Sequence, residues 1–548
     1  AYANNIATVQ TETSTIKGKV IDSQTGEPLT GAYITVNGTK KVAVTNLDGE
    51  FTIDAKPGDQ LVVTSLGYEK MQVRATNNLT VSMPSTATML NETVVVGYNT
   101  QKRNSLTGSM QSIGSKELTN VTTANVTNML TGKVPGLNVM PGSGKPGSFG
   151  AIIVRGKSTI NGSTAPLWVI DGVIVGKDPG DINPNDIETL TVLKDAASTA
   201  IYGSQGANGV IVVTTKGAQT GKTSISFSAK AGISTLNNGN VKMMNGAELY
   251  DYYKSFSNAA ELSFARWNEK LRESNFDWWK LATHTGNVQN YDLTINSGGE
   301  KLSAVFTGGV YKENGAVRGY DYTRYNTMVK LNFRPYSWIA IRPAINGSKG
   351  AIDDRQRSTY SMYSMLPWDS PYDANGKIIG NYSSSWVNSN STNYLYELQY
   401  NWSKYDSYSF NGNFDFDLYL TDWLTFSSVN SYRWASHLDK SYVDPRTSGA
   451  KDEGRVSEST STNTRRYTNQ LLKATRNFDK YHGFLMLGYE FNDGEYRFHS
   501  GDGQGLVPGY AQLDVTSTPK SVKGNKYAWA VQSFFANLNT DYADKYLL

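Results

Sequence analysis

The sequence predicts a mainly β protein in three consecutive parts: an immunoglobulin-like β-sandwich, an α+β globule, and a transmembrane antiparallel β-barrel. Three patterns predict this class. Short apolar strands separated by glycine turns fill residues 15–83, strands and two short helices mix over 105–217, and long, strictly alternating strands occupy 218–548. Residues 1–14 are expected to form a flexible N-terminus.

Length and composition exclude several classes of protein. A chain of 548 residues is too long for one hydrophobic core. The net charge of +4 comes from 52 basic and 48 acidic residues without a long basic block, which does not favour nucleic acid as a partner. The absence of cysteine excludes disulfides, thiolate metal sites and cysteine nucleophiles. No run of 18 apolar residues occurs, whereas a barrel strand needs only about ten alternating residues.

The predicted sandwich contains seven or so short strands. Turn sequences at 23–28, 37–38 and 47–49 separate most of them. The clearest strand segments are 16–22, 32–36, 42–45, 50–53 and 60–65.

Residues 84–104 are expected to be a linker that contains one short apolar strand. The strand has no evident local partner, and soluble proteins normally avoid an unpaired strand edge. Two interpretations remain open: a partner protein adds a strand to it, or it is an ordinary strand of the following domain. The residues concerned are Glu92, Thr93, Val94, Val95, Val96, Gly97 and Tyr98.

Residues 105–217 are predicted to form a compact, glycine-rich α+β globule. Helical segments are expected at 124–130 and 196–202, each followed by a glycine that ends it. Strands are expected at 152–156, 167–172, 187–193 and 210–215.

Residues 218–548 are predicted to form a sheet with one apolar and one polar face. In 405–420, for example, aromatic and aliphatic residues alternate with serine, asparagine and aspartate. Tight turns alternate with long excursions at 233–287, 349–404, 437–461 and 492–524, which is typical of an outer-membrane barrel. We count ten strands and the start of an eleventh. Because an open apolar edge is costly in lipid, we expect this chain to be an N-terminal portion or a fragment of a longer protein.

Sequences that partly match enzyme motifs have simpler explanations. Residues 142–147 fit G-x-G-x-x-G, but Pro146 and a strand replace the helix that would hold a pyrophosphate. Residues 217–223 resemble a P-loop with one residue too few. The four histidines are scattered, and carboxylates on the polar strand faces are expected to form a hydrated wall. We therefore predict no catalytic residues, metal site or cofactor.

Aromatic side chains concentrate in the predicted loops. Their flat apolar faces and polar tips suit stacking on sugar rings or peptides. The alternative is that these rings pack the loops or lie at the membrane interface. The candidates for substrate contact are Tyr360, Trp368, Tyr372 and Trp386.

From about residue 15 onward, the chain resembles a SusC-like TonB-dependent transporter. Residues 18–20, 29–32, 45–51 and 65–68 are similar to the carboxypeptidase regulatory-like domain that precedes such transporters. The globule is similar to the family's plug domain through long motifs. Those motifs are at 153–156, 169–173, 182–188, 192–198 and 202–211, and they include Arg155, Gly156, Asp171, Gly172, Lys194, Asp195, Tyr202, Gly203, Asn208 and Gly209.

The resemblance implies a function and a set of partners. Residues 92–98 would be the TonB box, and the barrel would have about 22 strands, of which about half are present here. The location would be the outer membrane of a Gram-negative bacterium, in contact with its lipid. Partners would be TonB and a SusD-like surface lipoprotein, with a dimer of such pairs allowed. The substrate would be an oligosaccharide or, alternatively, a peptide or another non-glycan ligand.

Two rival classes are an enzyme and a soluble β-rich adhesin. The carboxypeptidase-related domain lacks zinc-ligand histidines, so the resemblance is to a non-catalytic domain. An adhesin would be soluble without detergent from residue 222 onward.

Overall fold

A computed structural model of the chain describes residues 15–23, 26–39, 41–65, 68, 70–83, 93–96, 99–102, 110–118, 122–140, 142–180, 182–218, 223–256, 264, 266–355, 359–447, 453–479, 481–542 and 546–547. The chain divides into two compact units, 1–94 with 100–106 and 95–99 with 107–548. Each unit is described by itself.

The first unit contains a β-sandwich of two sheets, as the sequence predicts. Its core is closed by alternating apolar residues such as Ile16, Val20, Ile34, Leu61 and Val81. One sheet has the order β4-β1-β7, with strands Glu50–Asp54, Thr15–Asp22 and Leu79–Met83. The other has the order β3-β2-β5-β6, with strands Val42–Val44, Tyr33–Val36, Gln60–Thr64 and Met71–Arg74.

The predicted linker contains a strand that does have a local partner. Strand β8 (Thr93–Val96) forms a two-stranded sheet with β9 (Asn99–Lys102). The expectation that this strand has no local partner is therefore wrong. The sequence Asn-Thr-Gln-Lys carries no apolar alternation, but a strand ladder uses backbone groups and does not require it. Glu92, Gly97 and Tyr98, and the side chains of β8, lie outside the described residues.

The globule is built on a mixed five-stranded sheet with the order β10-β15-β16-β13-β14. Strands β13 and β16 are parallel and the other neighbours are antiparallel. Leu190, Val192, Ile211 and Val213 lie fully buried in the core between this sheet and the short helices. The strands are Met110–Gly114, Ile187–Leu193, Val210–Thr215, Leu167–Ile170 and Val173–Gly176.

Short elements complete the globule. The predicted helices are present but shorter, as α2 (Val126–Met129) and α3 (Ala196–Thr199). The pair β11 (Leu137–Met140) and β12 (Ala151–Val154) forms a second small sheet. The remaining pieces are α1 (Ser115–Leu118), η2 (Pro184–Asp186) and η3 (Ala200–Gly206).

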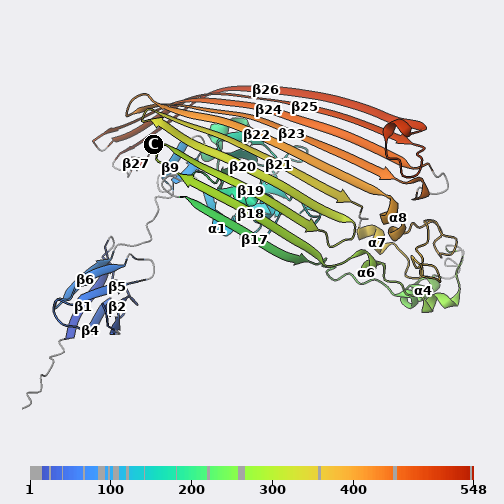
Figure 1. Ribbon diagram of the computed structural model, residues 1–548, viewed down its shortest axis with the longest axis horizontal. Helices are drawn as coiled ribbons and strands as arrows, with labels where there is room; N and C mark the ends of the chain where they lie inside the picture. The colour runs from blue at the N-terminus through green and yellow to red at the C-terminus, as the bar shows by residue number, and fades with distance from the viewer. Residues whose placement is uncertain are drawn as a thin grey trace, which may run out of the picture. The chain divides into compact units, whose positions relative to one another are not determined.

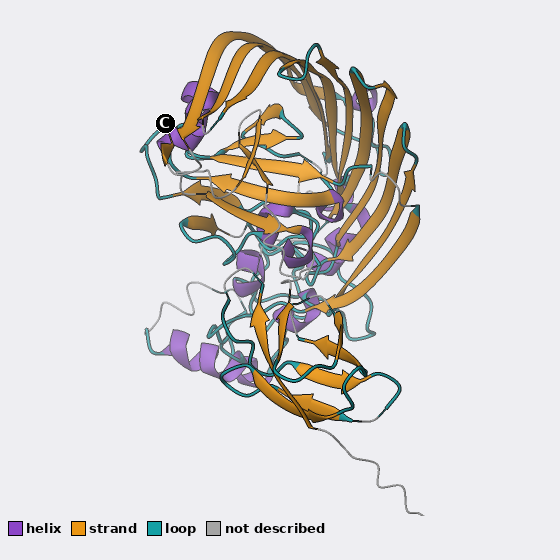
Figure 2. Ribbon diagram, turned by 90° about the vertical axis from the view of Figure 1, so that its left-hand side faces the viewer, coloured by secondary structure: helices purple, strands orange, loops and turns teal. Residues whose placement is uncertain are grey.

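The rest of the second unit is an eleven-stranded antiparallel sheet in which each strand pairs with the next along the chain. The sheet curves around the globule (Figures 1 and 2). Its strands β17 to β27 are Ser224–Ser234, Gly286–Gly298, Leu302–Asn314, Tyr320–Tyr336, Ile339–Asp354, Trp402–Tyr419, Leu424–Val443, Arg455–Phe478, Tyr481–Gln504, Thr518–Tyr542 and Tyr546–Leu547.

The predicted alternation places apolar residues outside and polar residues inside. On β22, Phe410 and Phe414 are exposed on the outer face. On its inner face, Ser409 and Asn411 bond to Ser348 and Asn346 of β21 at 2.7 and 2.8 Å. Aromatic rings also collect at the tight turns, where they suit a membrane interface: Tyr336, Trp338, Tyr419, Trp423, Phe478 and Tyr481.

Two predicted long loops are mostly strand. Only 444–454 and 505–517 separate the strands where the sequence suggested 437–461 and 492–524. The serine- and threonine-rich ends of β23 to β26 look like loops in sequence, yet they continue the backbone ladder. A further connection, 315–319, is much shorter than the long excursions on that side.

Two long loops, 235–285 and 355–401, carry helices that gather at one end of the sheet (Figure 1). These helices are α4 (Gly246–Lys254), η4 (Glu269–Glu273), α6 (Trp278–Ala282), α7 (Thr359–Tyr363) and α8 (Tyr394–Tyr400). No helix within the described ranges is both long and apolar enough to span a membrane.

Candidate functional site where the globule meets the sheet

The hairpin β13–β14 presents a charged tip to the inner face of the sheet. Asp171 and Gly172 form its two-residue turn, with φ of 49° and 83°, as a tight hairpin between twisted strands requires. The Asp171 carboxylate accepts hydrogen bonds from the backbone and hydroxyl of Thr215 at 2.9 and 2.8 Å. It also accepts from Nζ of Lys330 on β20 at 2.8 Å. The predicted motif residue Asp171 therefore shapes the turn and ties the globule to the sheet.

A second polar contact centres on the asparagines before η2. The side-chain amides of Asn183 and Asn185 each donate to Asp292 of β18 at 2.9 Å. Arg324 of β20 donates to Asn183 Oδ1 at 3.2 Å and also to the carbonyl of Ala124. These side chains bond to one another in a nearly water-free contact, since Arg324 is 2% and Asn183 is 3% exposed; among the described residues, Arg324 Nε has no hydrogen-bond partner.

Asp186 is an unusual member of this second contact. Burial raises the pKa of its carboxyl to about 6, and the nearby Asp292 carboxylate acts in the same direction. Thr307, Lys216 and Arg324 act in the opposite direction. The globule is thus held against the sheet by a group that titrates between mildly acidic and neutral pH.

The glycine-rich loop 142–148 makes the third polar contact. Lys145 pairs with Asp354 of β21 at 2.8 Å, and the hydroxyl of Tyr320 donates to the carbonyl of Pro146 at 3.0 Å. Asn125 of the globule holds the loop by donating to the carbonyls of Gly147 and Ser148 at 2.9 and 2.6 Å. This segment fixes the globule to the sheet and does not form a phosphate-binding turn.

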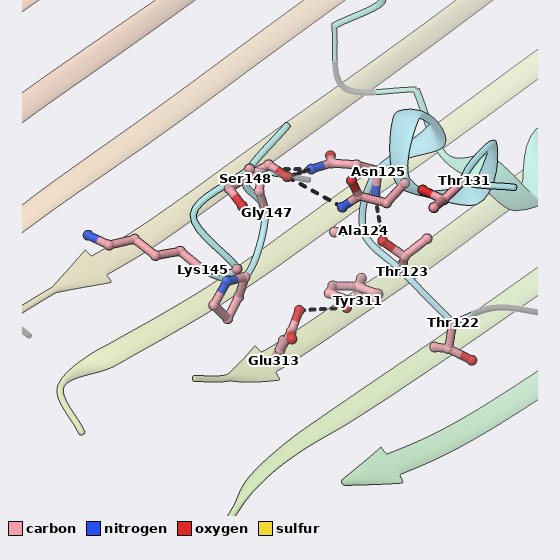
Figure 3. A pocket seen from close by; sticks show the side chains of 14 residues that line it. Thr122, Thr123, Ala124, Asn125, Thr131, Lys145, Gly147, Ser148, Tyr311 and Glu313 are labelled. Carbon is pink, nitrogen blue, oxygen red and sulfur yellow. Dashed lines mark hydrogen bonds between the residues drawn. The ribbon is translucent and has the colours of Figure 1, made fainter. Parts of the chain in front are cut away.

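A cavity of about 230 Å³ lies between this loop and β19 (Figure 3). Its lining is rich in hydroxyl, amide and carboxyl groups, and the Tyr311 hydroxyl donates to Glu313 at 2.7 Å. Hydroxyls and amides donate and accept hydrogen bonds, which suits a ligand with many hydroxyl groups. The lining includes Thr122, Thr123, Asn125, Asn128, Thr131, Lys145, Ser148, Tyr311 and Glu313.

The globule also contacts the sheet through apolar side chains. Val169 and Ile174 of the hairpin and Tyr202 of η3 pack with Tyr467 and Leu471 of β24. Burial and the nearby Glu490 raise the pKa of the Tyr202 hydroxyl. The globule therefore has a polar interface with β18 to β21 and an apolar one with β24 and β25.

The other predicted motif residues serve the globule's own fold. Arg155 and Gly156 form a turn with φ of 56° and 100°. Lys194 donates to the carbonyl of Pro135 at 3.0 Å, and Asp195 caps α3 through the amide of Ser198.

The last three motif residues, Gly203, Asn208 and Gly209, shape the segment that leads into β16. Gly203 lies outside helical geometry, with φ of 56° and ψ of −147°. Asn208 bonds to Ser158 and to the carbonyl of Ser163 at 2.8 and 2.7 Å. Gly209 has φ of 89°, and a side chain there would touch Val154 at 3.1 Å.

The four predicted substrate-contact rings divide into two classes. Trp368 and Trp386 are 7% and 2% exposed, and their indole nitrogens donate to the carbonyls of Gly246 and Ser370 at 2.8 and 2.7 Å. They hold the loops together, which is the alternative that the sequence left open. Tyr360 and Tyr372 are 78% and 37% exposed and remain candidates. Within the described part of the chain, no group of three or more histidine, aspartate or glutamate residues could hold a metal ion.

Comparison with protein families matches both N-terminal parts of the chain. The family model for the TonB-dependent Receptor Plug Domain matches residues 102–210. The model for the CarboxypepD_reg-like domain matches residues 16–96.

Curated proteins are similar to this chain in sequence. The TonB-dependent receptor SusC of Bacteroides thetaiotaomicron is 35% identical over 335 residues, which cover 58% of this chain and 32% of that receptor. The chain is a SusC-like TonB-dependent receptor. The TonB-dependent receptor P26 of Formosa agariphila is 28% identical to this SusC-like receptor over 556 residues, which cover 96% of the present chain and 54% of P26. TonB-dependent transporters are not enzymes.

A solved structure supports the fold. The RagAB peptide importer in its open-open state superposes with a TM-score of 0.74 at 22% identity, over 83% of this SusC-like receptor and 55% of that chain. The globule is thus the plug, and the curved sheet is of the outer-membrane β-barrel type. The chain spans about half the length of P26 and of the RagAB chain.

Proposed function

We propose that the protein imports an oligosaccharide across the outer membrane, with energy supplied by TonB and with a SusD-like lipoprotein at the surface. The polar interface between plug and sheet carries this proposal. Most of its hydrogen bonds have a charged partner and contribute about 1.5 to 3 kcal/mol net each. When TonB pulls, these bonds can be exchanged for bonds to water, so that the plug separates from β18 to β21 while its apolar contacts with β24 and β25 persist.

The path for the substrate would follow the polar wall. The inner faces of β18 to β22 carry amide, hydroxyl and charged groups, and the polar cavity beside Tyr311 and Glu313 adjoins this wall. Such groups match the hydroxyls of a sugar chain, which both donate and accept. The loop helices gather at the end of the sheet away from the tight turns, where a surface lipoprotein would bind.

Residues 92–98 would be the segment that TonB grips. Strand β8 has β9 on one edge, and no strand lies against its other edge in the part of the chain that the structure describes. A TonB strand added there would form main-chain hydrogen bonds that do not depend on side chains. Because these bonds would be loaded in shear, they act together when TonB pulls.

Transport assays with a ligand panel test the proposal. Cells that produce the full receptor are given radiolabelled neutral and acidic oligosaccharides and peptides of matched length, with and without active TonB. We expect accumulation of an oligosaccharide only when TonB is active. Accumulation of peptides alone would support the alternative substrate class, and uptake without TonB would overturn the proposed energy source.

A further inference from the structure

An arginine contacts two aromatic rings on the outer face of the sheet, at the end that carries the tight turns. The guanidinium carbon of Arg476 on β24 lies 5.7 Å from the centre of the Trp423 ring and 5.1 Å from that of Phe478. Leu471 is buried against the plug, so the alternation of the strand places Leu472 and Arg476 on the opposite face. The cation is therefore held on the side of the sheet that faces lipid.

Arg476 has no ionic partner among the described residues. Its side chain is exposed, and no carboxylate oxygen in the described part of the chain lies within 4.0 Å of its guanidinium nitrogens. By contrast, Arg466, which lies on the same face of the same strand, pairs with Asp493. A guanidinium group carries several N–H donors and no acceptor. Those of Arg476 are available to an anion from outside the protein.

The neighbouring strand leaves room beside this guanidinium group. Gly483 of β25 lies directly opposite Arg476 in the antiparallel register, so the two positions share a face of the sheet. Apart from its chain neighbours, a Cβ atom at Gly483 would come within 4 Å of one described atom, the carbonyl oxygen of Arg476 at 3.7 Å. The glycine thus keeps an open space on the lipid-facing surface next to the cation.

The surroundings of this space change from aromatic to aliphatic along the strands. Towards the turn lie the exposed rings of Phe478 and Tyr481, which suit the headgroup region of a membrane. Towards the long loops, the same face carries the exposed leucines Leu472, Leu485 and Leu487. The guanidinium group therefore lies where the apolar band of the outer face ends and the headgroup region begins.

We propose that Arg476 binds the phosphate group of a phospholipid in the leaflet that faces the periplasm. Outer-membrane barrels carry their short turns on the periplasmic side, which places this end of the sheet in that leaflet. Guanidinium N–H groups match phosphate oxygens in charge and geometry, and the Trp423 and Phe478 rings orient the group through cation–π contacts. The space over Gly483 admits the headgroup, and the leucines contact an acyl chain.

Photocrosslinking of the full receptor in phosphatidylcholine nanodiscs tests this inference. The discs contain a low and equal fraction of one of two probes with the same photoreactive acyl chain. One probe is phosphatidylglycerol, which carries an anionic phosphate, and the other is diacylglycerol, which carries none. Mass spectrometry locates the crosslinks. We expect phosphatidylglycerol to label residues 472–487 about tenfold more than diacylglycerol does.

Three variants separate the site from general lipid contact. Arg476→Gln should lower the phosphatidylglycerol labelling to the diacylglycerol level. Gly483→Leu should also lower it, because the leucine occupies the open space while the arginine stays. Arg466→Gln is the matched control and should keep the wild-type labelling, since that arginine already has a carboxylate partner. Wild-type labelling of Arg476→Gln, or equal labelling of the wild type by the two probes, would overturn the inference.

Inorganic phosphate distinguishes a lipid headgroup from a free anion at the same arginine. Added in excess over the probe at constant ionic strength, it should leave the labelling unchanged, because the free anion lacks an acyl chain. Displacement of the probe by inorganic phosphate would identify a site for a soluble anion and overturn the proposal. Oligosaccharide import stands or falls independently of these results.

Discussion

Lys330 on barrel strand β20 donates a 2.8 Å hydrogen bond to Asp171, at the tip of the plug hairpin. Both side chains are less than one fifth exposed, and Asp171 is held in a left-handed turn with φ of 49°. One plug residue thus sets the hairpin geometry and anchors it to the barrel. Interactions of this kind decide how readily the plug moves.

Replacing Lys330 with alanine should loosen the hairpin. The Asp171 carboxylate would keep its hydrogen bonds from Thr215 but lose the ammonium group of Lys330, which should destabilise the plug by about 1 to 3 kcal/mol. We expect faster hydrogen exchange in β13, β14 and β16, measured by mass spectrometry on the full receptor. Lys301→Ala, at an exposed turn position, is the control and should leave exchange unchanged. Equal exchange in both variants would show that the ion pair does not hold the plug.

Asp186 should make plug attachment depend on pH. Its folded pKa of about 6 lies above the ordinary value of 3.8, so the folded state binds the proton more tightly than the unfolded chain. The corresponding stability is present below about pH 4 and is lost as pH rises through 6. Thermal unfolding should therefore show a less stable plug at pH 7 than at pH 5.

Asp186→Asn should flatten this pH dependence, because the amide has the same shape and does not titrate. At pH 7, the free energy of unfolding of the variant should exceed that of the wild type by about 1 to 3 kcal/mol. Asp178→Asn, which changes an exposed carboxylate, should keep the wild-type profile. A variant profile as steep as that of the wild type would assign the titration to another group.

Trp368 should matter for loop structure. Its ring packs with Tyr250, Leu271 and Val387, and removing a buried tryptophan costs about 3 to 5 kcal/mol. Limited proteolysis of Trp368→Ala should therefore cut within 235–285 and 355–401 much faster than in the wild type. Unchanged cleavage would mean that the loops hold without this ring.

Tyr360 should matter for binding instead. The side chain is 78% exposed, so Tyr360→Ala should leave proteolysis unchanged. Loss of one stacking contact should weaken oligosaccharide binding about two- to tenfold, measured by titration. If Tyr360→Ala binds the oligosaccharide with wild-type affinity, Tyr360 does not contact the substrate.

The sequence predicts most of the fold because the period of two along each strand is a local signal. Prediction from sequence fails where that alternation is weak. The polar strand Asn99–Lys102 pairs with β8, and the serine- and threonine-rich ends of β23 to β26 resemble loops in sequence but are strands in the structure. Burial of Trp368 and exposure of Tyr360 depend on how two distant loops pack. The contact between Asp171 and Lys330 joins residues 159 positions apart, and no local pattern encodes it.

The most direct test of TonB-driven import removes residues 92–97 from the full receptor and measures two quantities in the same cells. Surface binding and intracellular accumulation of a labelled oligosaccharide are compared with those of the wild type. A deletion of equal length, 84–89, serves as the control that leaves β8 intact. We predict unchanged binding with accumulation reduced to the level of TonB-deficient cells, and wild-type accumulation in the control. Accumulation that persists without residues 92–97 would contradict the account.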